Sequence, residues 1–320
     1  MSLELELSSM KLESSSRRDD ATTTYTTCTT KTFSVVHRIW KSGSTMQAEV
    51  VAVLGAVTDF IKEKGSESDT AYFAVLLSAL DSTPKGESDR VGAIAYLLTL
   101  VVKKVRREVL QSSFSQSCKI LSDKLVEVAN PVALKYIIQV LGFVLGAQSI
   151  SIWQFANNKN LLVSISQFVM HEKPWVRTMA RRIVRSILTD PVKALENGLH
   201  PGASAVGQFV SSRIEDVDDT SAARLLCLLE GCLYKMPSDI FGRMAISILK
   251  LTTRPNGSLK CTALQCLQRT LQQQPSDVVL PIEWNVELIE RIRAAAPPSN
   301  DVAVCAYWMQ ALAEAHSLSS

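Results

Sequence analysis

Apolar residues recur along the chain at the spacing that places them on one face of a helix. The segment PWVRTMARRIVRSILTD, starting at Pro174, carries one such face, made of Val176, Ala180, Ile183, Val184, Ile187 and Leu188. About 43 residues earlier, starting at Pro131, PVALKYIIQVLGFVLGA repeats the pattern in nearly the same phase. Each of these segments is predicted to form an amphipathic helix.

The same pattern starts again at regular intervals of roughly 38 to 45 residues. Its origins are Gln47, Ser88, Pro131, Pro174, Asp219, Gly257 and Pro298. This period matches the ~40–47 residues of HEAT and armadillo repeats, which are built from helices stacked in register. Helical periodicity alone also fits an irregular all-α bundle, but the agreement of the origins favours repeats.

Each interval between origins contains a further apolar segment with helical spacing. These segments are residues 71–80, 114–128, 161–170, 203–214, 240–251 and 282–296. The sequence therefore predicts an all-α HEAT/armadillo-like α-α superhelix, a solenoid of about seven helix pairs, over residues 33–320. In such a stack each pair buries its apolar face against its neighbours, and an extended concave surface results.

The first 32 residues lack this pattern. Their Ser/Thr-rich stretch SSSRRDDATTTYTTCTTKT has almost no side chain to bury, so it cannot offset the entropy lost on ordering. We expect residues 1–32 to form a disordered arm, with order beginning near Phe33.

Composition agrees with a folded helical protein and excludes several classes. Hydrophobic residues make up 47% and charged residues 20% of the 320 residues, which allows a sizeable core. A net charge of +3 is too balanced to indicate a nucleic-acid binder by charge alone. The N-terminus lacks a secretory pattern, and the densest apolar run, residues 91–102, is about half of the ~20 residues that a membrane span needs. We expect a soluble intracellular protein.

The residues that carry chemistry indicate neither an enzyme nor a cofactor. The cysteines number seven and include no C-x-x-C pair, which favours a reducing compartment, cytosol or nucleus. Sequence motifs of nucleotide-binding loops, serine hydrolases and zinc proteases are missing. The four histidines lie far apart, so no shared metal site or catalytic dyad is expected among His37, His171, His200 and His316.

A run of acidic residues lies between two predicted helices. It consists of Glu215, Asp216, Asp218 and Asp219. A calcium-binding loop needs a central glycine and a terminal glutamate at fixed spacing, and this run has neither. We interpret it as a solvated turn.

Two basic segments supply the candidate binding residues. The first, in VVKKVRREV at the end of a predicted helix, contains Lys103, Lys104, Arg106 and Arg107. The second contains Arg177, Arg181, Arg182 and Arg185. Three of the second set are spaced by four residues and form one stripe along a helix.

Both basic segments lie on second helices of their pairs, which in HEAT-like solenoids line the concave side. A positive stripe there suits a phosphate backbone or an acidic partner helix. Three other roles remain open. Basic residues near a helix C-terminus complement the helix dipole, a charged face can simply be solvated, and Arg177 can bond to a neighbouring repeat.

Parts of the chain resemble a known family. The stretch from Thr32 to Ser82, with VGAIAYLLTLVVKKV after it, resembles the N-terminal region of the ribosomal RNA processing protein 12 family, which are large HEAT-repeat proteins. The segment HEKPWVRTMARRIVRSIL resembles the second helix of a HEAT repeat. In looser form the likeness continues to WMQALAEAHSLSS, so it covers most of residues 32–320.

The resemblance implies a non-enzymatic scaffold that takes part in the maturation and nuclear export of pre-ribosomal particles, chiefly of the small subunit. It implies contacts with ribosomal RNA and with assembly and export proteins. It also implies a location in the nucleus and nucleolus, with shuttling to the cytoplasm. The resemblance implies no catalytic residues, no cofactor, no membrane contact and no small-molecule substrate. Family members are several times longer, so the chain corresponds to an N-terminal portion or a truncated paralogue. The alternative is a nuclear transport receptor-like or general adaptor module that reads peptides.

Overall fold

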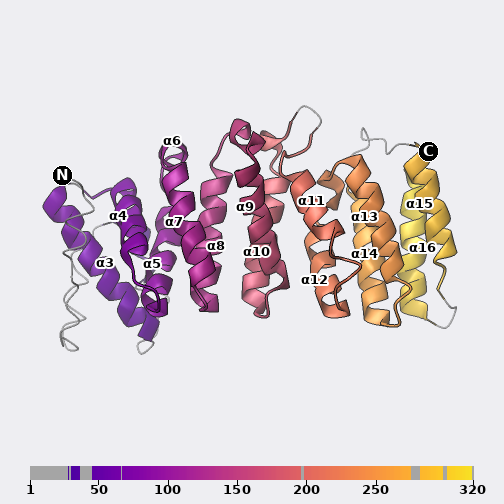
Figure 1. Ribbon diagram of the computed structural model, residues 1–320, viewed down its shortest axis with the longest axis horizontal. Coiled ribbons are helices and arrows are strands. Elements are labelled where there is room, and N and C mark those ends of the chain that lie inside the picture. The colour runs from indigo at the N-terminus through magenta and orange to yellow at the C-terminus, as the bar shows by residue number, and fades with distance from the viewer. Residues whose placement is uncertain are drawn as a thin grey trace. The chain divides into compact units, whose positions relative to one another are not determined.

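Helices make up nearly all of the ordered structure of this chain. The computed structural model describes residues 28, 30–36, 45–65, 67–195, 198–274, 282–297 and 301–318 (Figure 1). Over these ranges α-helices and short 3₁₀ helices (η) alternate with turns, and no strand occurs. The helices belong to two compact units, Met1–Gln148 and Ser149–Ser320.

The first unit stacks its helices in two layers. Its described helices are η2 (Lys31–Phe33), α3 (Thr45–Lys64), α4 (Asp69–Ser82), α5 (Ser88–Val101), α6 (Arg107–Ser112), α7 (Phe114–Glu127) and α8 (Pro131–Gly146). One layer contains α3, α5 and α8, packed in that order, and α4 packs against α7 in the other. The layers are joined because α4 packs on α5 and α7 packs on α8.

The middle of the first unit is α5, because α3, α4 and α8 all pack on it. Its residues Ala93, Ala95, Leu97 and Leu98 are fully buried. A helix that is apolar on all sides is stable only inside a protein, so the composition of α5 predicts this central place. Polar groups between the helices are paired, as where Tyr72 Oη and Thr58 Oγ1 lie 2.9 Å apart.

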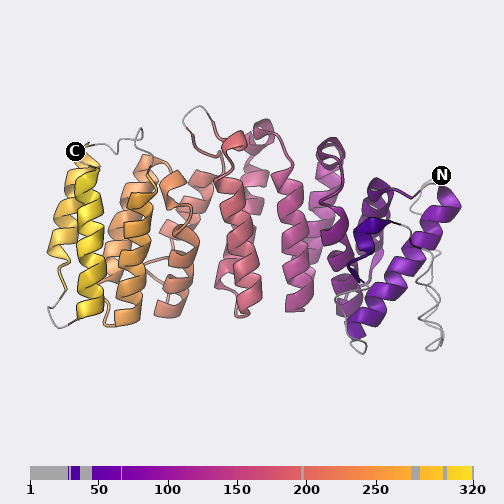
Figure 2. The same cartoon turned by 180° about the vertical axis from the view of Figure 1, so that it is seen from behind.

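The second unit repeats the two-layer arrangement, which Figure 2 shows from behind. Its described helices are η3 (Ile150–Gln154), α9 (Ala156–Gln167), η4 (Phe168–Met170), α10 (Pro174–Leu188), η5 (Pro191–Lys193), α11 (Ala203–Ser211), α12 (Asp219–Leu229), η6 (Leu233–Lys235), α13 (Ser238–Leu251), α14 (Gly257–Gln272), α15 (Ile282–Ala294) and α16 (Val302–Ser317). One layer contains α10, α12, α14 and α16, and the other contains α9, α11, α13 and α15. Within each layer, consecutive helices pack together.

Local capping explains why helices begin at the predicted origins. Asn130 accepts the amide proton of Val132 at 2.9 Å, and Pro131 occupies the first turn, where a missing N–H costs little. Asp218 caps α12 and Asn256 caps α14 in the same way. A capping oxygen satisfies amide groups that have no partner inside the helix, so it marks the start of the helix in the sequence itself.

The predicted all-α fold of stacked helix pairs is confirmed. Helices begin at five predicted origins, which are Ser88, Pro131, Pro174, Asp219 and Gly257. The Gln47 origin lies inside α3, and Pro298 lies outside the described residues, shortly before α16. The intervening segments match α4, α7, α9 with η4, α11, α13 and α15. That one uninterrupted solenoid spans residues 33–320 stays a prediction.

The predicted disordered arm lies mostly outside the described residues, which exclude 1–27 and 29. Its last residues contact α4. Thr32 Oγ1 donates a hydrogen bond to Asp69 Oδ1 at 2.7 Å, and Phe33 packs edge-on against Tyr72 with ring centres 4.9 Å apart. Contact with the first unit therefore begins a few residues before Phe33.

Candidate functional site

The first basic segment forms a turn, whereas the sequence predicted the end of a helix. Helix α5 ends at Val101, Lys103 and Lys104 lie in the turn that follows, and Arg106 is the residue before α6. Val102 and Val105 are buried within this turn. Lys103 and Lys104, which lie between them, are exposed.

Two cations of this first segment have structural partners. Arg107 Nε donates to the carbonyl of Ala147 at 2.8 Å, and its Nη2 donates to that of Gln148 at 3.2 Å. These carbonyls lie at the C-terminal end of α8, and carbonyls at this end of a helix have no partner inside the helix. Lys103 Nζ lies 5.5 Å from the centre of the Phe143 ring, a cation–π contact. Arg107 therefore caps the end of α8.

The second basic segment lies on α10, and its arginines have different surroundings. Arg185 reaches the next helix pair, where Nε donates to the carbonyl of Leu228 at 3.2 Å and Nη2 donates to that of Cys227. Space for this guanidinium exists because residue 231 is glycine, on which a Cβ would lie 3.0 Å from Arg185 Nε. Arg185 is thus a bond between α10 and the end of α12.

Arg177 bonds to its own preceding turn, whereas the sequence left open a bond to a neighbouring repeat. Its Nη1 donates to the carbonyls of His171 at 2.8 Å and Glu172 at 2.7 Å. Arg182 is exposed, and its Nη2 lies 3.6 Å from Met179 Sδ. Arg182 follows Arg181 by one residue, so it points about 100° away around the helix.

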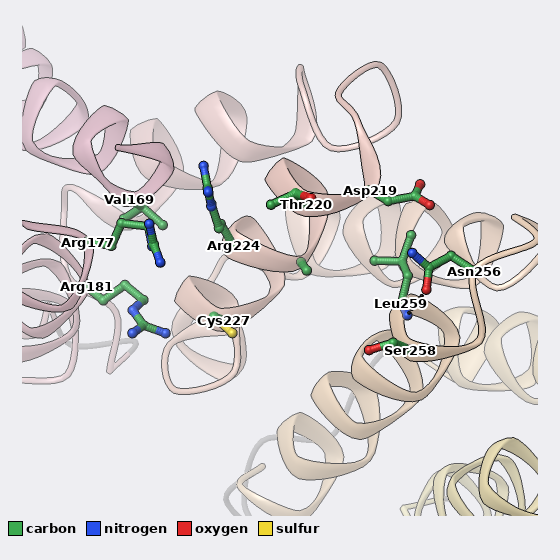
Figure 3. A pocket seen from close by; sticks show the side chains of 11 residues that line it. Val169, Arg177, Arg181, Asp219, Thr220, Arg224, Cys227, Asn256, Ser258 and Leu259 are labelled. Carbon is green, nitrogen blue, oxygen red and sulfur yellow. Dashed lines mark hydrogen bonds between the residues drawn. The ribbon is translucent and has the colours of Figure 1, made fainter. Parts of the chain in front are cut away.

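Three arginines of the second unit, Arg177, Arg181 and Arg224, line one groove between α10, α12 and α14 (Figure 3). Its volume is about 400 Å³. Arg177 and Arg181 line it from α10, Arg224 from α12, and Asn256 and Leu259 from the start of α14. We call it the arginine groove. The stripe predicted from the sequence thus contributes two of its members, while Arg182 and Arg185 do not line the groove.

Sequence reasoning missed Arg224, which stands alone in the apolar helix α12. A signal for it existed, because Arg224 follows Arg181 by 43 residues, close to the repeat period. Residues one period apart on successive second helices become neighbours when those helices stack.

The arginine groove has an excess of positive charge. Arg177, Arg181 and Arg224 form no ion pair with any described acidic residue. The lining carboxylate, Asp219, is paired with Arg254 Nη1 at 3.0 Å. Burial, then the charges of Arg224 and Arg181, lower the pKa of Arg177. Uncompensated like charges held this close favour the binding of an anion.

The acidic run beside the groove is more than the solvated turn that the sequence suggested. Glu215 accepts hydrogen bonds from Ser247 Oγ at 2.5 Å and from Lys250 Nζ at 3.0 Å. These bonds, which come from α13, lower the pKa of Glu215. Asp218 caps α12, and Arg254 bonds to Asp219 and to the carbonyl of Val217. The run therefore fixes the start of α12 against α13 and the turn before α14.

The three histidines in the described part of the chain lie in separate segments. His200 is buried, its Nδ1 accepts the amide proton of Gly202 at 3.0 Å, and its ring meets Trp153 edge-on at 4.6 Å. His316 Nε2 lies 3.0 Å from Arg293 Nη2, His171 precedes α10, and His37 is outside the described residues. Across the described part of the chain, no three His, Cys, Asp or Glu residues are grouped to hold a metal ion.

No described helix has both the length and the apolar character that crossing a bilayer requires.

Most of the chain is similar in sequence to one family of known proteins. Residues 27–216 match the family model described as "RRP12-like, N-terminal HEAT repeats". The RRP12-like protein of Gallus gallus is 31% identical over 302 residues, covering 90% of this chain and 23% of the relative. The RRP12-like protein of Homo sapiens is 28% identical over 299 residues, with the same two coverages of 90% and 23%.

A more distant relative, the RRP12-like protein of Drosophila melanogaster, is 23% identical over 318 residues. It covers 91% of this chain, and the match again spans 23% of the relative. The chain thus spans about a quarter of the length of the curated relatives it matches. Arg177 and Arg181 lie within the residues that match the family model, whereas Arg224 and Asn256 lie after them.

Proposed function

This chain belongs to the RRP12-like family, whose N-terminal HEAT repeats it matches over residues 27–216, and we propose that it is a non-enzymatic scaffold in ribosome biogenesis. In this role it takes part in ribosomal RNA processing and in the maturation and nuclear export of pre-ribosomal subunits. Its partners are pre-ribosomal particles and their assembly and export proteins. It works in the nucleus and nucleolus and can shuttle to the cytoplasm.

One observation carries the proposed contact with these particles. Arg177, Arg181 and Arg224 line one groove without an acidic partner among the described residues. Pre-ribosomal particles offer anions in the form of RNA phosphates and acidic protein segments, and guanidinium groups bind both through charge-assisted hydrogen bonds. We propose that the arginine groove is where the chain meets an anionic component of the particle.

The fold suits this role because the groove is held in shape before a partner arrives. Arg185 joins α10 to the end of α12, and Arg254 joins the start of α12 to the turn before α14. The arginines of α10 and α12 therefore keep a constant separation. Binding to a site that is already arranged loses less conformational entropy than binding that must order the site first.

The test is co-sedimentation with pre-ribosomal particles in a sucrose gradient of nuclear extract. The tagged chain is expected to travel with small-subunit precursors. Arg181→Glu should remove most of the particle-bound fraction, because it reverses a charge inside the groove. Arg182→Glu is the matched control, since the same charge change on the next residue of α10 falls outside the groove. Circular dichroism should show equal helicity for both variants.

Two results would overturn the proposal. The wild-type chain could remain at the top of the gradient, in which case it is no component of these particles. Alternatively, both variants could sediment with the particles as the wild type does, and then the groove is not the contact.

A second candidate function is a transport receptor-like adaptor that reads peptides of proteins unconnected with ribosomes. The apolar side chains of Val169, Ala223 and Leu259 among the groove's lining residues favour it, since peptides carry apolar side chains and RNA backbones do not. In that case protein cargo copurifies with the chain from nuclear extract, and precursor ribosomal RNA does not.

A further inference from the structure

We infer that the arginine groove binds an extended acidic peptide segment of a protein partner, with the oxyanions of its side chains facing Arg177, Arg181 and Arg224. This inference rests on the proposed function, because it names the component that meets the same surface.

Donors left over on the three guanidinium groups are the first argument. Arg177 donates from Nη1 to the carbonyls of His171 and Glu172. Arg224 donates from Nη1 to the carbonyl of Met170. Arg181 uses Nη2, on Thr178 Oγ1 at 3.3 Å. A guanidinium group carries five N–H donors, so each arginine is anchored at one atom and keeps others for a ligand. The ligand must supply acceptors, preferably charged ones.

Spacing is the second argument. Arg177 and Arg181 are one turn apart on α10, which separates them by about 6 Å along the helix axis. In an extended peptide, side chains on the same face recur about every 7 Å. A peptide with an acidic residue at every second position, lying along α10, therefore presents one oxyanion to each arginine.

The other walls suit the rest of such a peptide. Leu259 is an apolar residue that lines the groove from α14, and it can pack against the alternate side chains of the peptide, which point away from α10. Asn256 Oδ1 accepts the amide proton of Leu259, which leaves the side-chain amide nitrogen of Asn256 to donate to a peptide carbonyl. Figure 3 shows Asn256 and Ser258 across Thr220 and Cys227 from Arg177 and Arg181.

The lining disfavours single-stranded RNA as the occupant. None of the residues that line the groove is aromatic, and Trp175, the exposed aromatic residue of α10, is not among them. Sites for single strands obtain much of their affinity from bases stacked on aromatic rings.

Fluorescence anisotropy with defined probes tests the inference. The probes are a fluorescein-labelled ten-residue peptide that alternates glutamate with valine, the same peptide with phosphoserine in place of glutamate, and fluorescein-labelled decauridylate. The chains are the wild type, Arg181→Gln, Arg224→Gln and Arg182→Gln. Thermal unfolding by circular dichroism verifies that all four fold alike.

Peptide binding is expected, and Arg181→Gln and Arg224→Gln should each weaken it at least tenfold, equivalent to about 1.4 kcal/mol. Arg182→Gln should change it less than twofold. Tight binding of either peptide supports the inference, and the tighter of the two identifies the oxyanion as carboxylate or phosphate.

Other outcomes separate this inference from the proposed function. If decauridylate binds more tightly than both peptides and Arg181→Gln weakens it, RNA occupies the groove; the inference is then overturned while the proposed function stands. If Arg181→Gln and Arg182→Gln behave alike with every probe, the groove is not a binding site and the inference is overturned. If the peptides bind as expected but the chain never sediments with pre-ribosomal particles, the proposed function fails and the inference stands.

Discussion

The two basic segments, one in each unit, contain four cations each and have different surroundings. In the first unit Arg107 caps the end of α8 and Lys103 lies over an aromatic ring. In the second unit Arg177 and Arg181 line a groove with Arg224 and meet no acidic partner among the described residues. The segments differ because only the second brings its cations together with an arginine of another helix in one groove.

The units also differ in the hydrogen bonds that a buried basic side chain makes. Lys124 of the first unit is buried, and its Nζ donates to the carbonyl of Thr83 at 2.9 Å and to Glu127 at 3.2 Å. His200 of the second unit is buried with no hydrogen-bond partner for Nε2. Hydrogen bonds and pairing offset the cost of burying a cation, whereas a buried histidine without an acceptor is stable only when neutral.

The largest difference between the units should appear on acidification. Burial, then the charge of Lys193, lowers the pKa of His200 from 6.5 to about 4, although Asp190 opposes the shift. The folded-state pKa lies below the unfolded one, so this stability is complete above pH 6.5 and falls as the pH drops toward 4. By pH 4.5 the second unit should lose about 2–3 kcal/mol of unfolding free energy.

Urea unfolding followed by tryptophan fluorescence measures this loss, because four of the five tryptophans belong to the second unit and only Trp40 belongs to the first. The variant His200→Phe should lose less stability between pH 6.5 and 4.5, and His171→Gln should behave like the wild type. An unchanged pH dependence in His200→Phe would show that other groups cause the acid sensitivity.

The next largest effect should come from Arg185→Ala. This change leaves the carbonyls of Leu228 and Cys227 without their donor and removes the bond between α10 and α12. We expect the unfolding free energy of the second unit to fall by about 2 kcal/mol. Arg182→Ala, on the exposed side of the same helix, should change it by less than about 0.5 kcal/mol. Equal values for the two variants in urea titrations would contradict a structural role for Arg185.

A smaller loss is expected for Arg107→Ala in the first unit. Arg107 is exposed, and Gln111 Nε2 still donates to the carbonyl of Ala147 at 3.0 Å after the arginine is removed. The unfolding free energy should fall by about 1 kcal/mol, which amide hydrogen exchange at the end of α8 can detect. Exchange that is unaffected there would mean that Arg107 is as free for a ligand as the arginines of the groove.

The smallest effect is expected for the double variant Lys104→Gln with Arg106→Gln. These side chains have no polar partner among the described residues, yet they lie outside the arginine groove. Removing both charges should change the affinity for the alternating glutamate peptide less than twofold, as measured by anisotropy. A tenfold loss would show that net charge, and not the groove, attracts the peptide.

Most of the fold was predictable because its causes are local. The apolar period of α10, the proline that opens α8 and the caps Asp218 and Asn256 can all be read without tertiary information. The turn at residues 103–104 was predicted less well. The apolar pattern continues through Val102 and Val105, whose spacing of three residues also fits a helix, so this pattern does not mark the end of the helix at Val101.

Two of the three arginines that line the groove were predictable, for the same reason. The four-residue spacing of Arg177 and Arg181 places both on one face of α10, and both line the groove. Arg185 has the same spacing but meets carbonyls of residues 42 and 43 positions later in the chain. Its neighbours depend on how α12 packs, so no local pattern distinguishes it from the other two.

By itself the sequence determined where the helices begin, which of their faces are buried and to which family the chain belongs. Helical periodicity and capping act over a few residues, so they can be identified from the amino-acid sequence alone. Only the tertiary structure decided which cations keep unused donors, because a guanidinium is satisfied by whichever carbonyl or carboxylate the neighbouring helix pair brings within about 3 Å. That packing, and not composition, made a groove from Arg177, Arg181 and Arg224.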